Sequence, residues 1–249
     1  MITTKITGTD NYSGRLIKDI VAEDFRAAAI FEKHGIDFCC KGKRALKDAC
    51  RDKQLNIDEV ITDLTQIEQT SGSKESERYD LWELDYLTMY IINNHHKYVQ
   101  RSIPQITGHL EKIMQVHGKK HPYLEEVTKL FYSVSNELIS HLRKEENILF
   151  PMVMNLMTIT KANGNLKHLD SSIAMPIAVM EREHDSAGSI LERIRVITNN
   201  FTLPEDACGT FEVTYKELDE FERDLHKHVF LENSILFPKA IALEKSLKQ

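Results

Sequence analysis

The sequence predicts an all-α protein in which a small N-terminal helical domain precedes an up-down four-helix bundle. Glycine and proline are scarce, with 10 and 6 in 249 residues, and no segment shows a sustained alternation of Val, Ile and Thr. Long stretches instead place apolar residues three and four positions apart, which is the spacing of one helix face. Strands are therefore not expected, and every element predicted below is a helix.

The composition favours a folded cytoplasmic protein with neither a nucleic-acid nor a membrane partner. Hydrophobic residues make up 41% of the chain and charged residues 28%, which is enough for a packed core. The net charge is −6, and the short Lys41–Lys47 segment is the only basic cluster, so phosphate binding is not expected. Residues 1–10 lack the apolar core of a secretory signal, and no window approaches about 18 uninterrupted apolar residues. Four cysteines are too few for a disulfide scaffold, which indicates reduced thiols.

A polar segment divides the chain into two predicted domains. Thr70–Glu77 reads TSGSKESE and has no helical periodicity, so residues 70–79 are interpreted as a linker. The first domain covers residues 1–69 and contains the adjacent pair Cys39 and Cys40. Its expected helices cover residues 16–33, ended by Gly35, then 44–53, and 57–69 with Asn56 as a cap.

The second domain, residues 80–249, is expected to contain four long antiparallel helices. The apolar pattern places them at residues 80–116, 122–157, 173–199 and 203–246. Gly118 and Pro122 separate the first two, and Gly164 lies between the second and third. Thr202 and Glu205 have the spacing of a capping box at the start of the fourth. Short connections between long helices favour antiparallel neighbours, hence a four-helix bundle.

Each of the four apolar stripes is interrupted by a histidine. Two eleven-residue segments, HLRKEENILFP at 141–151 and HVFLENSILFP at 228–238, repeat the interruption with a glutamate four residues later. The first two stripes are Met89, Ile92, His96, Val99, Ile103, Ile106, Leu110, and Val127, Phe131, Val134, Leu138, His141, Glu145, Ile148, Met152. The other two are Ile173, Ile177, Met180, His184, Ala187, Leu191, Ile194, and Phe211, Thr214, Leu218, Phe221, Leu225, His228, Glu232, Ile235.

These interruptions predict a buried site for two metal ions. Burying charged or polar side chains without partners is costly, so six of them on inward faces need a common reason. Residues four apart share a helix face, so each His–Glu pair can reach one site. Imidazole and carboxylate suit a borderline metal such as iron, although manganese and zinc also fit. Two bridging carboxylates leave two histidines for each ion and room for an oxo or hydroxo bridge. The expected ligands are His96, His141, Glu145, His184, His228 and Glu232.

Several nearby residues have alternative roles in this pattern. His95 adjoins His96 but falls on a mixed face, so His96 is the expected ligand and His95 is placed behind it or at the surface. Glu137, Asp224 and Glu183 lie close in sequence to predicted ligands and either orient an imidazole or are solvated charges. If the His–Glu pairs were exposed they would be simple intrahelical ion pairs, which the apolar register argues against. The remaining histidines are expected in loops or at the surface: His34, His109, His117, His121, His168 and His226.

Five segments resemble a known family. The two repeated segments, EREHD at 181–185 and NNHHKYV at 93–99 are similar to the hemerythrin-like domain of the RIC proteins, the di-iron repair-of-iron-centres family that includes ScdA and YtfE. GIDFCCKGKRAL at 35–46 resembles the short cysteine-containing domain of the same family. The resemblance covers nearly the whole chain in the same order. Ordinary hemerythrins fit less well, because they typically have five histidines and an open position for oxygen.

The resemblance implies a cytoplasmic di-iron protein that restores iron–sulfur clusters damaged by nitric oxide or peroxide, with damaged iron–sulfur proteins as its clients. It also implies the six ligands named above, with Glu145 and Glu232 bridging two irons and an oxo bridge between them. The same residues are compatible with a carrier or sensor of O₂ or NO, or with reduction of nitric oxide, so the sequence does not decide whether the protein is an enzyme. The sequence is also compatible with a homodimer.

The paired Cys39 and Cys40 are the candidate redox thiols of the first domain. They are expected to hold iron, to exchange electrons or to dock a client, and their plain alternative is that of small buried apolar residues. Neighbouring Lys41, Lys43 and Arg44 are expected to lower a thiol pKa, which would favour reactivity.

Overall fold

The computed structural model describes the chain apart from residues 1–9, 70–77, 163, 165–171 and 249. Its described elements are helices, with a single isolated bridge between Leu16 and Ala45, which confirms the all-α prediction. The chain divides into two compact units, Met1–Glu83 with Val229–Pro238, and Leu84–His228 with Lys239–Gln249. The predicted linker falls largely outside the described residues, so the boundaries at 69 and 80 stay a prediction.

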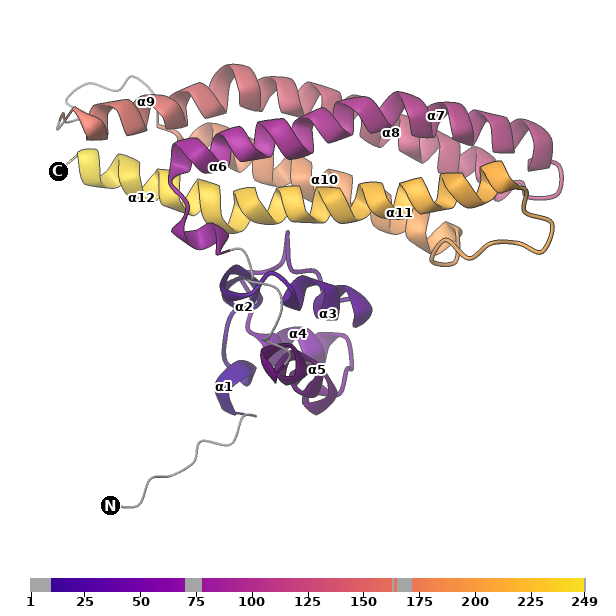
Figure 1. The fold of residues 1–249 in the computed structure, drawn as a ribbon, viewed down its shortest axis with the longest axis horizontal. Helices are drawn as coiled ribbons and strands as arrows, with labels where there is room; N and C mark the ends of the chain where they lie inside the picture. The colour runs from indigo at the N-terminus through magenta and orange to yellow at the C-terminus, as the bar shows by residue number, and fades with distance from the viewer. Residues whose placement is uncertain (1–9, 70–77, 163, 165–171, 249) are drawn as a thin grey trace. The chain divides into compact units, whose positions relative to one another are not determined.

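Short helices make up the N-terminal part (Figure 1). They are α1 (Asp10–Ser13), α2 (Ile17–Glu23), α3 (Ala27–Lys33), α4 (Leu46–Asp52) and α5 (Ile57–Gln69), followed by a single 3₁₀ turn, η1 (Tyr79–Leu81). The prediction of one helix over 16–33 is wrong. Asp24 has an extended backbone (φ −145°), and its carboxylate accepts hydrogen bonds from the Arg26 amide at 2.9 Å and the Arg26 side chain at 3.0 Å. Aspartate competes in this way with the helical hydrogen-bond pattern, which ends α2 and lets α3 begin anew.

Two predicted helix ends are confirmed in this part. Gly35 has φ +64°, and the amide of Ile36 donates to the carbonyl of Phe31 at 2.7 Å, which closes α3 with a left-handed residue. At the start of α5, Asn56 Oδ1 accepts a hydrogen bond from the Asp58 amide at 3.0 Å.

Four long helical rods form the second part and lie side by side (Figure 1). The first comprises α6 (Leu84–Ile91), the π turn η2 (Ile92–His96) and α7 (Lys97–His117). The second comprises α8 (Tyr123–Lys144), the π turn η3 (Glu145–Leu149) and α9 (Phe150–Lys161). The third is α10 (Ala174–Ile197). The fourth comprises α11 (Gly209–Phe230), the π turn η4 (Leu231–Leu236) and α12 (Phe237–Leu247).

The fourth rod begins later than predicted. Asn199, Asn200 and Phe201 all have φ between 50° and 56°, which is left-handed backbone and cannot continue into a right-handed helix. The hydroxyl of Thr202 donates to the carbonyl of Asn199, and the helix begins only at Gly209. The capping box predicted from Thr202 and Glu205 is therefore wrong.

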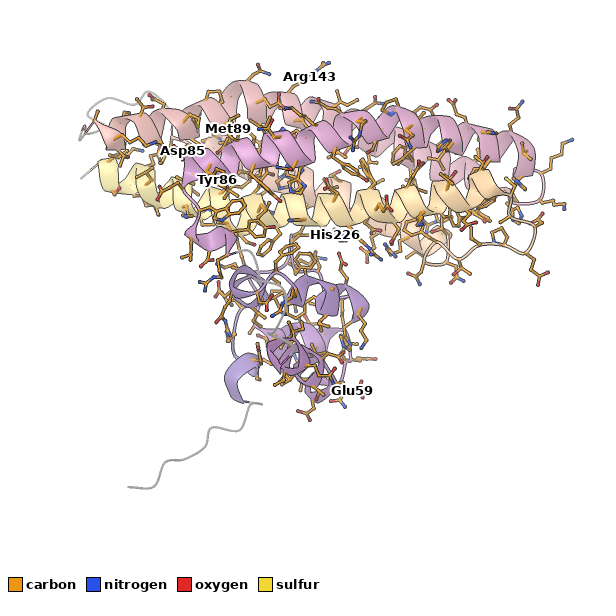
Figure 2. All side chains as sticks on the ribbon, viewed as in Figure 1. Glu59, Asp85, Tyr86, Met89, Arg143 and His226 are labelled. Carbon is orange, nitrogen blue, oxygen red and sulfur yellow. The ribbon has the colours of Figure 1, made fainter. Side chains whose placement is uncertain are left out.

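Two of the π turns, η2 and η3, explain where the predicted apolar stripes fail. In the first rod, Met89 is 47% exposed on α6 (Figure 2), whereas Ile91 is fully buried. In the second rod, Ile148 is 54% exposed, whereas Leu149 is buried. A π turn holds one more residue than an α turn, so it moves the buried face by one position. The stripe of α10, which has no π turn, is buried throughout as predicted.

Candidate metal centre

The six predicted ligands are all buried. His96, Glu145, His228 and Glu232 have no exposed surface, and His141 and His184 are each 2% exposed. Charged and imidazole side chains are seldom this deeply buried unless they are paired or bind a metal. The inward register predicted for these six positions is therefore confirmed.

The six side chains form two overlapping groups that share both carboxylates. His96 and His228 join Glu145 and Glu232 in one group, and His141 and His184 join the same two glutamates in the other. Within each group the candidate ligand atoms lie within 4.8 Å of one another. Each group thus offers two imidazoles and two carboxylates, an arrangement in which two cations bridged by both glutamates would be held.

The inward-facing atoms converge at distances that suit a cation between them. Nε2 of His141 and Nε2 of His184 are 3.0 Å apart, and both imidazole rings can direct a lone pair there. Oε2 of Glu145 lies 3.3 Å from Nε2 of His141, 3.4 Å from Nε2 of His96 and 4.0 Å from Nε2 of His228. These distances exceed the usual N–H···O hydrogen bond of about 2.9 Å, whereas two ligands of one ion are typically about 3 Å apart.

The opposite nitrogen of two of these rings contacts a carboxylate. Nδ1 of His96 is 2.8 Å from Glu146 Oε1, and Nδ1 of His141 is 2.9 Å from Glu183 Oε2. A carboxylate at Nδ1 holds the proton there and leaves Nε2 free of hydrogen, which is the usual support of a metal-bound histidine. Donor set, burial and this support all fit a pair of metal ions.

The π turns carry three of the six residues. His96 is the last residue of η2, Glu145 is the first of η3, and Glu232 is the second of η4. Pro151 and Pro238 follow in the first turns of α9 and α12, where the missing proline N–H falls on the π turn rather than on a regular α turn. Single π turns occur often at functional sites, where the wider turn redirects side chains.

The comparison with known families agrees with this geometry. The Hemerythrin HHE cation binding domain matches residues 88–240, which include all six residues. The chain belongs to the hemerythrin HHE family. A second family, ScdA_N, described as a domain of unknown function (DUF542), matches residues 14–68 of this HHE protein.

Curated relatives resemble the HHE protein over most of its length. Proteins named "Iron-sulfur cluster repair protein YtfE" from Enterobacter sp. (strain 638), Escherichia coli O81 (strain ED1a) and Escherichia fergusonii are each 36% identical to it. Each match covers 88% of this chain and 93% of the relative. The family resemblance inferred from the sequence is confirmed. No described helix of the HHE protein is long and apolar enough to cross a membrane.

Three acidic residues around the HHE site have distinct surroundings. Glu183 adjoins His184 in sequence but contacts His141, and it also accepts a hydrogen bond from Lys144. Burial alone would raise the pKa of Glu183, but these two hydrogen bonds outweigh it and lower the pKa. Glu137 instead accepts hydrogen bonds from the Ser133 and Ser186 hydroxyls. Glu146 was missed, because nothing in its spacing distinguishes it from a solvated residue next to Glu145.

His95 is buried beside the site rather than at the surface. It is 3% exposed, and its Nδ1 lies 2.9 Å from Oδ1 of Asp224. Its ring stacks on that of His228, with centroids 5.8 Å apart and planes 9° apart. It does not belong to either group of candidate ligands, so His96 stays the predicted ligand and His95 supports His228 from behind.

The paired Cys39 and Cys40 form a separate cluster with Asp37 in the N-terminal part. Sγ of Cys39 lies 3.7 Å from Sγ of Cys40, and Oδ1 of Asp37 accepts hydrogen bonds from both backbone amides, at 3.1 and 2.9 Å. The neighbouring Cys40 thiol, burial and Asp37 together raise the pKa of Cys39 well above its usual value. The expectation that Lys41, Lys43 and Arg44 lower a thiol pKa is therefore wrong for Cys39. The side chains of Asp37, Cys39 and Cys40 could together hold a metal ion.

Replacing Glu183 with glutamine is expected to weaken metal binding without emptying the site. The amide can still contact His141 but no longer holds a charge opposite its Nδ1 proton. Changes of this kind typically cost about 10–100-fold in metal affinity. Competition with a chromophoric chelator measures the loss, and Glu192→Gln, an exposed position on the same helix, is the control. Equal affinity in both variants would contradict the role given to Glu183.

Proposed function

We propose that this protein holds two iron ions between its four long helices and uses them to repair iron–sulfur clusters damaged by nitric oxide or peroxide. The observation that carries the proposal is the pair of ligand groups sharing Glu145 and Glu232. The relatives described above carry the name of iron–sulfur cluster repair proteins, and their similarity extends over both parts of the chain. Damaged iron–sulfur proteins are then the clients, and the cytoplasm is the proposed location.

The donor set supports iron as the metal. Four imidazoles and two carboxylates provide nitrogen and oxygen donors without thiolate, which suits iron better than a soft metal. We include an oxo or hydroxo bridge between the two ions in the proposal, since two histidines and two shared carboxylates leave positions open on each. When bound, such irons supply exchangeable iron for a damaged cluster and a place where nitric oxide can react.

The protein residues bind and orient, and they exclude water. Glu146 and Glu183 fix the rings of His96 and His141 through Nδ1, so that Nε2 of each ring stays directed inward. The Phe150 ring stacks on His96 with centroids 5.4 Å apart and planes 19° apart. Phe150 is 2% exposed and covers one side of the site with apolar surface. This dry, fixed environment favours retention of the metals until a client or a small gas molecule reaches them.

Reactivation of a client tests the proposal directly. A hydro-lyase whose four-iron four-sulfur cluster has lost iron to nitric oxide but kept its sulfide is incubated with the iron-loaded protein, a reductant and no added iron. We expect recovery of hydro-lyase activity well above that given by chelator-treated protein, because only the loaded protein brings iron and the reactive site.

Two other results would overturn the proposal in favour of a different function. A reversible optical band on exposure to O₂ or NO, with no recovery of the client, indicates a carrier or sensor. Nitrous oxide accumulating in the headspace with no recovery indicates nitric oxide reduction.

A further inference from the structure

A second cluster of metal-ligand side chains lies at the far end of the bundle from the first. Helix α7 runs from the first site at His96 to His117, which at 1.5 Å per residue is about 30 Å along the helix axis. The connection from α7 to α8 and the connection from α10 to α11 meet at this end (Figure 1). They bring together His117 at the end of α7, His121 from the first connection and Asp206 from the second, with ligand atoms within 4.8 Å of one another.

A cysteine adjoins this cluster. Sγ of Cys208 lies 3.3 Å from Nε2 of His117, and Nε2 of His121 lies 2.8 Å from Oδ1 of Asp206. The hydrogen bond with His117, together with the backbone amides of Phe211 and Thr210, lowers the pKa of the Cys208 thiol to about 7.

The two histidines are held in place by an aromatic side chain from the fourth rod. Phe211 is fully buried, and the rings of His117 and His121 pack edge-on against it, with centroids 5.3 Å and 5.9 Å away. Their spacing, i and i+4, repeats the one that brings two ligands to one ion in the first site. Their polar ends are thereby fixed at the rim, while their apolar edges are covered.

We propose that His117, His121, Asp206 and Cys208 form a second metal site, selective for a tetrahedral borderline cation such as Zn²⁺. Two imidazoles, a carboxylate and a thiolate are the donor types of zinc sites, with bonds of about 2.0–2.3 Å. Such bonds place neighbouring ligand atoms about 3.3–3.6 Å apart, so the 3.3 Å between His117 and Cys208 already matches. An ion here ties the α7–α8 connection to residues 206–208, just before α11.

The competing arrangement is an ion pair without metal. Lys120 also contacts Asp206, with Nζ 3.1 Å from Oδ2, so the two connections are joined through charge alone when no ion is bound. Zinc binding would replace two contacts of the Asp206 carboxylate, the one with the Lys120 ammonium group and the one with Nε2 of His121. The two arrangements therefore differ in whether the protein retains metal, and in whether added zinc raises the melting temperature.

Metal retention by the full iron-loaded chain tests the site. The protein is incubated with Zn²⁺, desalted, and analysed for iron and zinc together. We expect one zinc per chain in addition to unchanged iron, and a Zn²⁺-dependent rise in melting temperature. With Co²⁺ as the probe we expect a thiolate charge-transfer band in the near ultraviolet, which Cys208→Ser abolishes.

Matched variants keep the outcome clear. Asp206→Asn and His117→Ala are expected to weaken zinc binding at least about tenfold. His109→Ala, which lies on the same helix and contacts Glu217 at 2.7 Å, is expected to bind zinc like the unaltered protein. Cys208→Ser and Asp206→Asn are conservative changes at exposed positions, so they report on binding even if His117→Ala is poorly folded. If the unaltered protein retains no more zinc than His117→Ala does, the cluster is an ion pair without metal and the proposal is overturned.

Discussion

Replacing Glu145 with leucine is expected to empty both metal positions and abolish cluster repair. Glu145 belongs to both ligand groups, and its carboxylate is fully buried among three imidazoles. Leucine has a similar volume, so the core stays filled while a ligand of each ion is lost. Iron bound per chain should fall at least about tenfold, and reactivation of a nitric-oxide-treated client should fall to the level of chelator-treated protein.

A second substitution separates a shared ligand from an unshared one. His184 belongs to only one of the two groups, so His184→Ala is expected to lose about one of two irons rather than both. Metal analysis after desalting, with Mössbauer spectroscopy of iron-57-loaded protein, distinguishes one ion from a coupled pair. Glu137→Gln, on α8 and bonded to serine hydroxyls rather than to a histidine, is the control. Full iron content in the Glu145→Leu variant would show that the carboxylate bridges nothing.

The burial and grouping of the six candidate ligands could be predicted because they follow from two simple rules. Side chains four residues apart share a helix face, and a buried polar side chain needs a partner. His141 with Glu145, and His228 with Glu232, satisfy both rules within a repeated segment. His184 could be placed because α10 is a regular helix, and its stripe extends without interruption over the whole length of the rod.

The surroundings of the site could not be predicted in the same way, because they depend on π turns. One extra residue in η2 buries His95 as well as His96 and replaces Ile92 by Ile91 in the core. One extra residue in η3 exposes Ile148. The residues of η2 and η3 do not mark them as π turns. A proline follows η3, and another follows η4, but none follows η2 in this way. A prediction based on a constant 3.6-residue period therefore fails on one side of η2 and of η3, whereas the predicted stripe of the fourth rod, from Phe211 to Ile235, is buried.

Contacts between distant helices were also beyond the sequence. Glu146 reaches His96 across 50 positions, and Glu183 reaches His141 across 42. Both lie next to a predicted ligand, yet each supports a histidine on a different rod. The cluster of His117, His121, Asp206 and Cys208 has the same origin, since two connections meet only once the rods are assembled. His117 and His121 were accordingly expected as loop or surface residues.

The second large effect is expected in stability, where Glu232→Gln should have opposite signs with and without metal. With metal bound, the amide is a poorer ligand, so the variant loses part of the stabilisation that binding gives the folded state and melts lower than the unaltered protein. Without metal, the carboxylates of Glu145 and Glu232 lie buried within 4.8 Å of each other, and their like charges oppose folding. Removing one charge while keeping the shape should then raise the stability of the metal-free protein.

A buried glutamate elsewhere on the fourth rod provides the matched control for this sign change. Glu222 is 3% exposed, and its partner is the Arg195 guanidinium, with Oε2 2.7 Å from Nε. Glu222→Gln breaks a charge pair that metal does not affect, so it should destabilise the protein equally in both states. Urea unfolding of each variant, with iron and after chelation, measures the four differences. If metal-free Glu232→Gln is no more stable than the metal-free unaltered protein, the burial of two carboxylates is not what the metal ions compensate.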